Sequence, residues 1–283
     1  MNISEALSKG YNLLKEAQIE SYIIDTQLLL SRVLNVDKLY LIMNRNEELP
    51  KETQVKFEEL LSKRKEKMPI AYILNDVEFM GFHYYVKEGV LIPRPDTEIL
   101  VEECLTIIKN NRLKTVCDMC CGSGAIGLAI GKHMEGSKVW LYDVSDTAIE
   151  VSERNRERFE LKERTNITKS DLFEVPLKER MTFDMIVSNP PYIEEHIIPT
   201  LMEDVKNYEP HLALSGGPDG LEFYRRICEE GKEILSTGGY MCFEIGYNQE
   251  QETKELLREN GFVDVYSLRD LGGNFRVVIG KLP

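Results

Sequence analysis

Residues 115–127 read TVCDMCCGSGAIG, and this stretch sets the fold that we expect for most of the chain. Its first half is an apolar run typical of a buried strand, and Gly122 and Gly124 follow where a helix should begin. Glycines there let the backbone approach a ligand closely, while the start of the helix offers free N–H groups. Gly127 completes a match to a dinucleotide fingerprint, although that match alone is weak.

Two acidic residues extend this signal. Asp143 ends the next expected strand nineteen residues after Gly124, a position from which a carboxylate accepts hydrogen bonds from ribose hydroxyls. Asp118 lies at the end of the first strand, where its charge favours a cofactor with positive groups over a pyrophosphate. The pattern predicts a nucleoside cofactor site, with a structural glycine turn and a surface Asp143 as the alternative.

The chain beyond residue 96 alternates between strand and helix patterns. We expect helices near 124–135, 145–158, 219–236 and 249–260, and strands at 115–120, 138–144, 166–171, 183–188, 240–245, 263–268 and 275–280. Such alternation predicts a doubly wound, largely parallel sheet. The connection at 270–274 is too short for a helix, so the last two strands should form an antiparallel pair.

A second ligand signal is FDMIVSNPPY at residues 183–192. The two prolines end a strand because they lack N–H groups, and they stiffen the corner that follows. This corner suits a planar group bearing an NH2: the Asn189 oxygen and the Pro190 carbonyl accept its two hydrogens, and Tyr192 covers its face. A proline-rich turn with a structural asparagine is an equally weighted alternative.

Asp171 and Leu172 end the third expected strand. Asp171 is placed to hold the exocyclic amine of adenine, with Leu172 against the ring, although a capping aspartate explains the same residues. Ligands of open α/β sheets bind outside the carboxyl ends of the strands, where all three motifs lie. Their convergence indicates one common site.

The N-terminal part has a different character. Residues 1–68 carry apolar residues at helical spacing and predict a small bundle, which serves either recognition or packing alone. Residues 69–95 alternate around turn residues and predict a β-hairpin linker that includes the strand-like residues 71–73. The domain that follows should span 96–283 and open with a helix capped by Asp96 or Thr97.

Composition limits the classes of partner. A net charge of −13 argues against stable nucleic-acid binding and favours a basic protein partner. No apolar run reaches membrane-spanning length and no secretion signal is visible, so we expect a cytoplasmic monomer without membrane contact. The six cysteines are expected to be free thiols, and Cys117-x-x-Cys120 lacks the second pair that a metal site needs.

The whole chain resembles the HemK/PrmC family, bacterial glutamine methyltransferases that modify class I peptide chain release factors with S-adenosylmethionine. The resemblance rests on LIPRPDTE at 91–98, the glycine turn, Asp143, NPPY at 189–192, Glu209-Pro210 and FEIG at 243–246. It implies a Rossmann-like class I methyltransferase fold with an antiparallel last strand, a β-hairpin linker and a helical recognition domain. One departure is Cys120, which stands where the family commonly has glycine.

Taken together, the motifs and the resemblance define an expected site, with S-adenosylhomocysteine as product. The expected cofactor-binding residues are Asp118, Cys120, Cys121, Gly122, Ser123, Gly124, Asp143, Asp171, Leu172 and Asn189. The substrate glutamine is assigned to Asn189, Pro190, Pro191, Tyr192 and Arg94, of which Asn189, Pro190 and Tyr192 would be catalytic, and no metal is expected.

The chemistry requires no strong base. An amide nitrogen is a poor nucleophile because its lone pair is delocalised, so acceptors that orient it supply proximity, alignment and electrostatics. His196 and His211, in the long segment after Tyr192, are therefore expected to be surface or loop residues. The alternatives are a ribosomal-protein glutamine methyltransferase, a nucleic-acid adenine amino-methyltransferase, an NAD-dependent oxidoreductase and a non-catalytic binding module.

Overall fold

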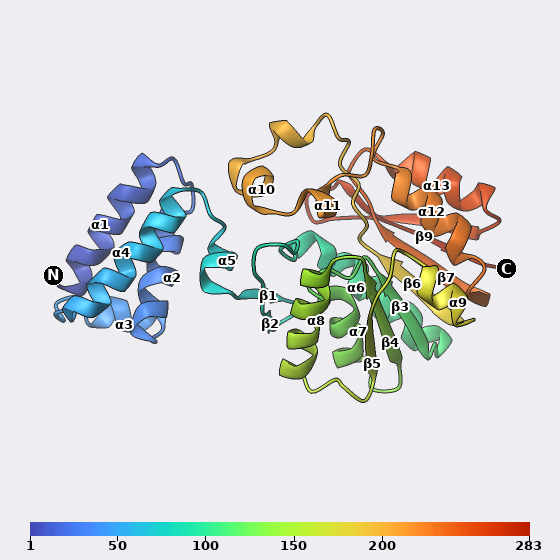
Figure 1. The fold of residues 1–283 in the computed structure, drawn as a ribbon, viewed down its shortest axis with the longest axis horizontal. Helices are drawn as coiled ribbons and strands as arrows, with labels where there is room; N and C mark the ends of the chain where they lie inside the picture. The colour runs from blue at the N-terminus through green and yellow to red at the C-terminus, as the bar shows by residue number, and fades with distance from the viewer. The chain divides into compact units, whose positions relative to one another are not determined.

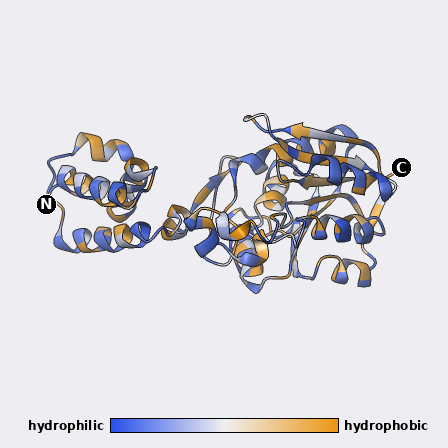
Figure 2. Ribbon diagram, turned by 90° about the horizontal axis from the view of Figure 1, so that it is seen from above, coloured by the Kyte–Doolittle hydropathy of each residue, from blue (hydrophilic) through white to orange (hydrophobic).

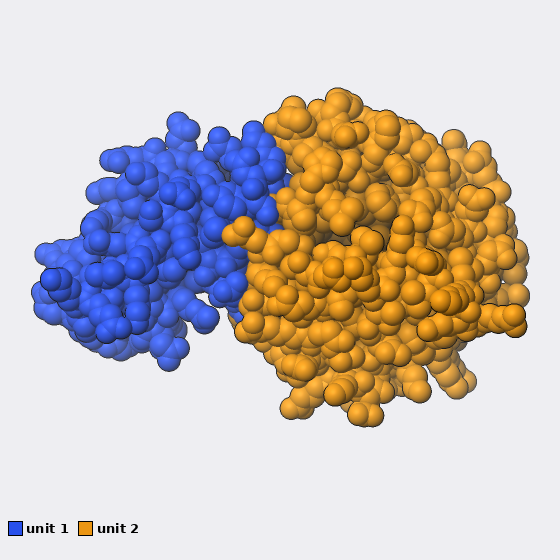
Figure 3. All heavy atoms as spheres, in the orientation of Figure 1, with its two compact units in different colours: residues 1–76, 202–208 blue, residues 77–201, 209–283 orange.

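The computed structural model describes residues 1–283 and contains two compact units (Figure 3). The first comprises residues 1–76 and 202–208, and the second comprises residues 77–201 and 209–283. No helix in either unit has the length and apolar content that crossing a membrane requires.

The first unit consists of helices. These are α1 (Ile3–Glu16), α2 (Tyr22–Leu34), α3 (Lys38–Met43), α4 (Lys51–Lys65), α5 (Ile70–Leu74) and α10 (Glu203–Tyr208). Asn2 begins α1 through a capping box, in which its side chain accepts the Glu5 N–H and the Glu5 carboxylate accepts the Asn2 N–H. These helices carry both polar and apolar residues (Figure 2), and the apolar ones form a buried core that includes Leu14, Leu29 and Phe57. The helical bundle predicted for this region is confirmed.

The segment at 70–74 differs from the prediction. Residues 71–73, interpreted as strand-like, belong to the helix α5, which follows Pro69 and ends where Asn75 takes a left-handed φ of 53°. A run of five residues is too short for apolar periodicity to distinguish a strand from a helix turn. Ala71 and Tyr72 are both buried, although neighbours on a strand would point to opposite faces.

The β-hairpin begins immediately after this helix. Strand β1 (Val77–Phe79) pairs antiparallel with β2 (Phe82–Tyr84), and both turn residues, Met80 and Gly81, have positive φ. A two-residue turn of this kind matches the twist of the strands. Tyr84 packs edge-on against Phe159 with ring centroids 4.7 Å apart, which anchors the hairpin within the second unit.

The second unit is built on a seven-stranded sheet with the order β5-β4-β3-β6-β7-β9-β8 (Figure 1). Its strands are β3 (Thr115–Met119), β4 (Lys138–Asp143), β5 (Thr165–Lys169), β6 (Phe183–Ser188), β7 (Leu235–Glu244), β8 (Val263–Arg269) and β9 (Phe275–Lys281). The pairs from β5 to β7 are parallel, whereas β9 runs antiparallel to both β7 and β8. The predicted sheet, including its antiparallel end, is confirmed.

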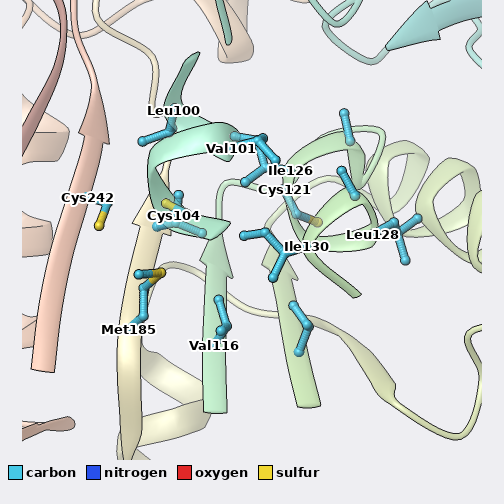
Figure 4. Packing of buried hydrophobic residues seen from close by; sticks show 14 of the residues in the cluster. Leu100, Val101, Cys104, Val116, Cys121, Ile126, Leu128, Ile130, Met185 and Cys242 are labelled. Atoms are coloured by element: carbon cyan, nitrogen blue, oxygen red, sulfur yellow. The ribbon is translucent and has the colours of Figure 1, made fainter. Parts of the chain in front are cut away.

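Helices pack against both faces of this sheet. The helices of the second unit are α6 (Glu98–Asn111), α7 (Ala125–His133), α8 (Asp146–Arg158), α9 (Glu174–Lys178), α11 (His211–Leu214), α12 (Glu222–Gly231) and α13 (Glu250–Glu259), with 3-10 turns η1 (Pro95–Thr97) and η2 (Ile198–Thr200). Val116 belongs to the same cluster as Leu100 and Cys104 of α6 on one face (Figure 4), whereas Cys117 belongs to the cluster containing Ile227 of α12. This period of two along β3 places a core on each side.

One strand starts earlier than the pattern indicates. Strand β7 begins at Leu235 instead of residue 240, and α12 ends at Gly231 instead of residue 236. Gly238 and Gly239 resemble a turn in the sequence, yet they lie inside the strand. A Cβ atom on Gly239 would come within 2.9 Å of the Asp184 carbonyl oxygen, so close approach of the backbones explains this glycine.

Candidate active site

A pocket opens at the carboxyl ends of β3, β4, β5 and β6, where the sequence places all three ligand motifs. Many of the predicted site residues line it, namely Cys120, Cys121, Gly122, Ser123, Asp143, Asp171, Leu172, Asn189 and Pro191. Five predicted residues do not line it, namely Asp118, Gly124, Pro190, Tyr192 and Arg94.

The glycine turn forms one wall of the pocket. Gly122 and Gly124 have φ of 55° and 77°, a left-handed conformation that a side chain disfavours. No atom lies within 4 Å of the place where a Cβ of Gly122 would stand, so the backbone is open to a ligand there. Gly127 serves packing instead, because a Cβ on it would lie 2.8 Å from Asp118 Oδ2.

Asp143 is held at the pocket by its own backbone neighbours. Its Oδ2 accepts the Gly122 N–H at 2.8 Å and its Oδ1 accepts the Ser145 N–H at 2.9 Å. Burial raises the pKa of this carboxyl, and the backbone N–H groups act in the opposite direction. Each oxygen retains a further lone pair, so Asp143 can accept two hydrogen bonds from a diol.

Asp171 and Leu172 line the pocket in different ways. Leu172 is 4% exposed and offers an apolar surface, as does Phe223 from α12. The Asp171 side chain is 58% exposed and accepts a hydrogen bond from Arg226 at 3.1 Å. A planar apolar ring therefore finds cover from Leu172, whereas Asp171 is already engaged and largely solvated.

The Asn-Pro-Pro-Tyr corner is fixed by contacts behind the pocket. The Tyr192 hydroxyl donates to Glu244 Oε1 at 3.3 Å, and the Tyr192 carbonyl accepts from Gln249 Nε2 at 2.9 Å. Asn189 and Pro191 face the pocket, with the buried Pro190 between them. The corner is thus stiff, as the prolines predict, and it meets the glycine turn and Asp143 in one cavity.

The sequence patterns alone missed several lining residues. They include Val90 and Pro93 after the hairpin, Thr97 at the start of α6, and Leu212 and Ala213 of α11. The only signals near them were the quoted matches at 91–98, which contain Pro93 and Thr97, and at Glu209-Pro210, which precede α11. The long segment after Tyr192 holds η2, α10 and α11.

Comparison with known proteins decides the family. The PrmC N-terminal domain matches residues 5–74, and the methyltransferase small domain matches residues 95–208. Release factor glutamine methyltransferases from Clostridium botulinum and Clostridium acetobutylicum are 48% and 47% identical to this chain, over 98% and 99% of its length and 98% of theirs. The chain belongs to the release factor glutamine methyltransferase family. The resemblance drawn from the sequence motifs is confirmed.

A solved structure supports the same fold. The hMettl16 catalytic domain in complex with the MAT2A 3′UTR hairpin 6 is similar with a TM-score of 0.59 at 16% identity, over 82% of each chain. This likeness concerns the fold alone. Three predicted site residues, Asp118, Cys120 and Arg94, have further contacts in the structure that bear on their roles.

Asp118 lies behind the glycine turn. It is fully buried, its Oδ2 accepts the Gly127 N–H at 2.8 Å, and its Oδ1 has no hydrogen-bond partner. Burial raises the pKa of this carboxyl to about 8, with a smaller contribution from the charge of Asp143. The structure thus brings Asp118 to the start of α7, outside the pocket lining.

We expect Asp118→Asn to change how stability depends on pH. The pKa of Asp118 is raised on folding, so its favourable contribution is complete below about pH 4 and is lost as the pH rises to about 8. As the pH rises from 5 to 9, the free energy of unfolding should therefore fall more for the wild type than for Asp118→Asn. Urea unfolding at both values measures this, and a difference independent of pH would contradict the raised pKa.

Cys120 has a backbone conformation that favours glycine, the residue that the family resemblance leads us to expect at this position. Its φ is 61°, in the left-handed region, which costs a side chain about 1–2 kcal/mol. The thiol interacts with the Ser188 hydroxyl, and burial raises the pKa of Cys120 well above its ordinary value. A neutral thiol therefore lines the pocket at this position.

Proposed function

We propose that this protein transfers a methyl group from S-adenosylmethionine to the side-chain amide nitrogen of the glutamine in the Gly-Gly-Gln motif of class I release factors. S-adenosylhomocysteine is the second product. The observation that carries the proposal is the single pocket lined by the glycine turn, Asp143 and the Asn189 corner. Relatives that are 47–48% identical over almost the whole chain carry the name of this activity, which supports the choice of substrate.

The pocket residues fit the proposed cofactor. Asp143 offers carboxylate oxygens to the ribose diol, and Leu172, Ile126 and Phe223 offer apolar cover for adenine. The open space at Gly122 admits the backbone-contacting part of the ligand. When bound, S-adenosylmethionine supplies an electrophilic methyl group on a sulfonium.

The residues of the corner act on the glutamine. The Asn189 Oδ1 and the Pro190 carbonyl accept the two amide hydrogens, which aligns the nitrogen and concentrates its electron density. Tyr192, fixed by Glu244 and Gln249, supports the far side of the corner. No side chain in this scheme removes a proton before attack, and water takes the proton afterwards. Catalysis therefore consists mainly of bringing the two reacting groups together and aligning them.

The helical region is assigned to substrate recognition. Residues 1–68 form the recognition domain in this proposal, 69–95 the linker and 96–283 the catalytic domain. The exposed apolar side chains Ile24, Ile42 and Met43, of which Met43 is 74% exposed, support a role in protein contact. The proposal includes action as a monomer in the cytoplasm, where release factors work.

A labelling experiment tests the proposal. The protein is incubated with tritiated S-adenosylmethionine and a release factor, a ribosomal protein or DNA. We expect label only on the release factor, in the peptide containing Gly-Gly-Gln, and none on a release factor in which that glutamine is alanine. Label on ribosomal protein or DNA instead would overturn the assignment of the substrate.

The two loops at the pocket are joined by an ion pair. The Arg94 guanidinium contacts Glu209 Oε1, and Glu209 also accepts the Ile92 N–H at 3.3 Å. The Glu209 side chain is 1% exposed, whereas that of Arg94 is 39% exposed. These contacts link the pocket-lining Pro93 to Pro210, so Arg94 has a structural partner besides the proposed substrate contact.

We expect Glu209→Gln to raise the Kd for S-adenosylmethionine about tenfold, because one charge-assisted hydrogen bond holding the pocket walls is weakened. Arg94→Ala should have a similar effect, and the double variant should be no worse than either single one. Isothermal titration of all three measures the coupling. Fully additive effects would show that the pair does not act as a unit.

A further inference from the structure

One buried side chain joins three separate stretches of the chain behind the pocket. Gln249 precedes α13, is 6% exposed and does not line the pocket. Its Oε1 accepts the Gly246 N–H at 3.0 Å, just after β7. Its Nε2 donates to the Tyr192 carbonyl at 2.9 Å and to the Gly220 carbonyl at 3.1 Å. The amide therefore bonds the end of a strand, the Asn-Pro-Pro-Tyr corner and the loop before α12 at once.

These partners fix the orientation of the Gln249 amide. A side-chain amide has an oxygen that accepts and a nitrogen with two hydrogens to donate. Both hydrogens and the oxygen are used only when the nitrogen faces the Tyr192 and Gly220 carbonyls and the oxygen faces the Gly246 N–H. The reverse orientation would bring one oxygen against two carbonyl oxygens, and buried polar groups left without partners cost free energy.

Residues 214–220 lie directly against the corner. The Ile193 N–H donates to the Leu214 carbonyl and the Gly216 N–H donates to the Ile193 carbonyl, both at 2.9 Å. A Cβ atom on Gly216 would lie 2.8 Å from the Pro191 carbonyl oxygen. Glycine is required where two backbones approach so closely, so the position of the corner depends on this stretch.

Gln249 closes the contact between the corner and this stretch. Gly220 has a φ of 71°, and a Cβ atom on it would lie 2.6 Å from Gln249 Nε2 and closer still to the Tyr192 carbonyl oxygen. The Tyr192 and Gly220 carbonyls thus converge on one NH2 group. Two carbonyl oxygens that converge in this way repel each other unless a donor lies between them. We call this arrangement the Gln249 clamp.

We propose that Gln249 is a positioning residue for methyl transfer, because its clamp fixes the corner whose Asn189 and Pro190 oxygens would accept the hydrogens of the substrate amide. The consequence for catalysis rests on the proposed function, whereas the clamp is a property of the protein alone. Tyr192 is two residues from Pro190, so a displaced Tyr192 carbonyl turns the peptide groups of the corner. A shift of about 1 Å in the reacting geometry is enough to slow a reaction strongly.

Two variants disrupt the clamp from opposite sides. Gln249→Glu keeps the side-chain shape and the acceptor for Gly246 but replaces the donating NH2 with an oxygen. Gly220→Ala places a methyl group in the same contact. Each should lower kcat for methylation of a release factor about tenfold, because the acceptors of the corner are displaced. The Kd for S-adenosylmethionine should stay within about twofold, because neither residue lines the pocket.

Each variant has a matched control. Gln251→Glu makes the same change at an exposed position of α13. Gly261→Ala adds a methyl group at a glycine whose φ is 90°, where no atom lies within 4 Å of the added Cβ. Both controls should keep kcat within about twofold of the wild type. The split between kcat and Kd separates positioning from a general loosening of the pocket, which would change both.

A second measurement needs no substrate. In protein labelled with ¹⁵N-glutamine, the side-chain amides of Gln249 and Gln251 are assigned by their loss in Gln249→Glu and Gln251→Glu. The hydrogens on Gln249 Nε2 should exchange with deuterium at least about 100-fold more slowly than those of Gln251, because they are buried and bonded to two carbonyls.

Three results would overturn the proposal. They are equal exchange rates for the two glutamines, a kcat within twofold of wild type in both clamp variants, and equal losses of kcat and of affinity for S-adenosylmethionine. A wild-type protein that methylates no release factor would refute the proposed function, and the exchange rates would then decide whether the clamp forms. Thermal melts identify a variant that fails to fold, in which case the other variant gives the kinetic result.

Discussion

Replacement of Asn189 with alanine is expected to lower kcat for methylation of the release factor about 100-fold or more, because it removes a preorganised acceptor from the amide that reacts. The pocket would retain Asp143, Leu172 and the glycine turn, so affinity for S-adenosylmethionine should change much less. Rapid-quench methyl transfer measures the first quantity and isothermal titration the second.

Tyr192→Phe is the matched control for this substitution. It keeps the aromatic ring and the proline corner, and it removes only the hydroxyl that donates to Glu244 at 3.3 Å. We expect a loss of less than about tenfold, because this hydrogen bond is long and lies behind the pocket, away from the amide that reacts. Methyl transfer by Asn189→Ala at nearly the wild-type rate would refute the acceptor role of Asn189.

The features that the sequence predicted correctly depend on short-range chemistry. Proline cannot donate to a ladder, so the end of β6 at Ser188 was visible from Pro190 and Pro191. The glycine turn at 122–124 was visible because positive φ favours glycine. Because strands joined by helices run parallel, their carboxyl ends lie at one edge of the sheet, and the glycine turn and the proline corner therefore meet there.

The features that the sequence did not predict depend on the direction in which a side chain points and on contacts between residues that are far apart in the sequence. Asp118 lies one residue before the end of β3, yet its side chain accepts the Gly127 N–H of α7 and does not line the pocket, as Asp143 does. Arg94 meets Glu209 across 115 residues of chain, a pairing that no local pattern encodes. The apolar run at 70–74, in which residues 71–73 are predicted as strand-like, is a helix because its five residues are too few for periodicity to distinguish the two structures.

The two acids of the pocket offer a sharper test of the cofactor site than either one alone. Asp143→Ala is expected to raise the Kd for S-adenosylmethionine about 100-fold, because two charge-assisted hydrogen bonds to the ribose are lost. It also releases the N–H groups of Gly122 and Ser145, which the carboxylate holds at 2.8 and 2.9 Å. The turn itself then loosens.

Asp171→Ala, the matched truncation, should raise the same Kd tenfold at most. Its side chain is 58% exposed and already bonded to Arg226, so a contact to the adenine amine gains little over water. Isothermal titration of both variants gives the ratio of the two effects. Equal losses would mean that the ribose and adenine ends of the ligand are anchored alike, and the assignment of the buried Asp143 as the main polar anchor would then be wrong.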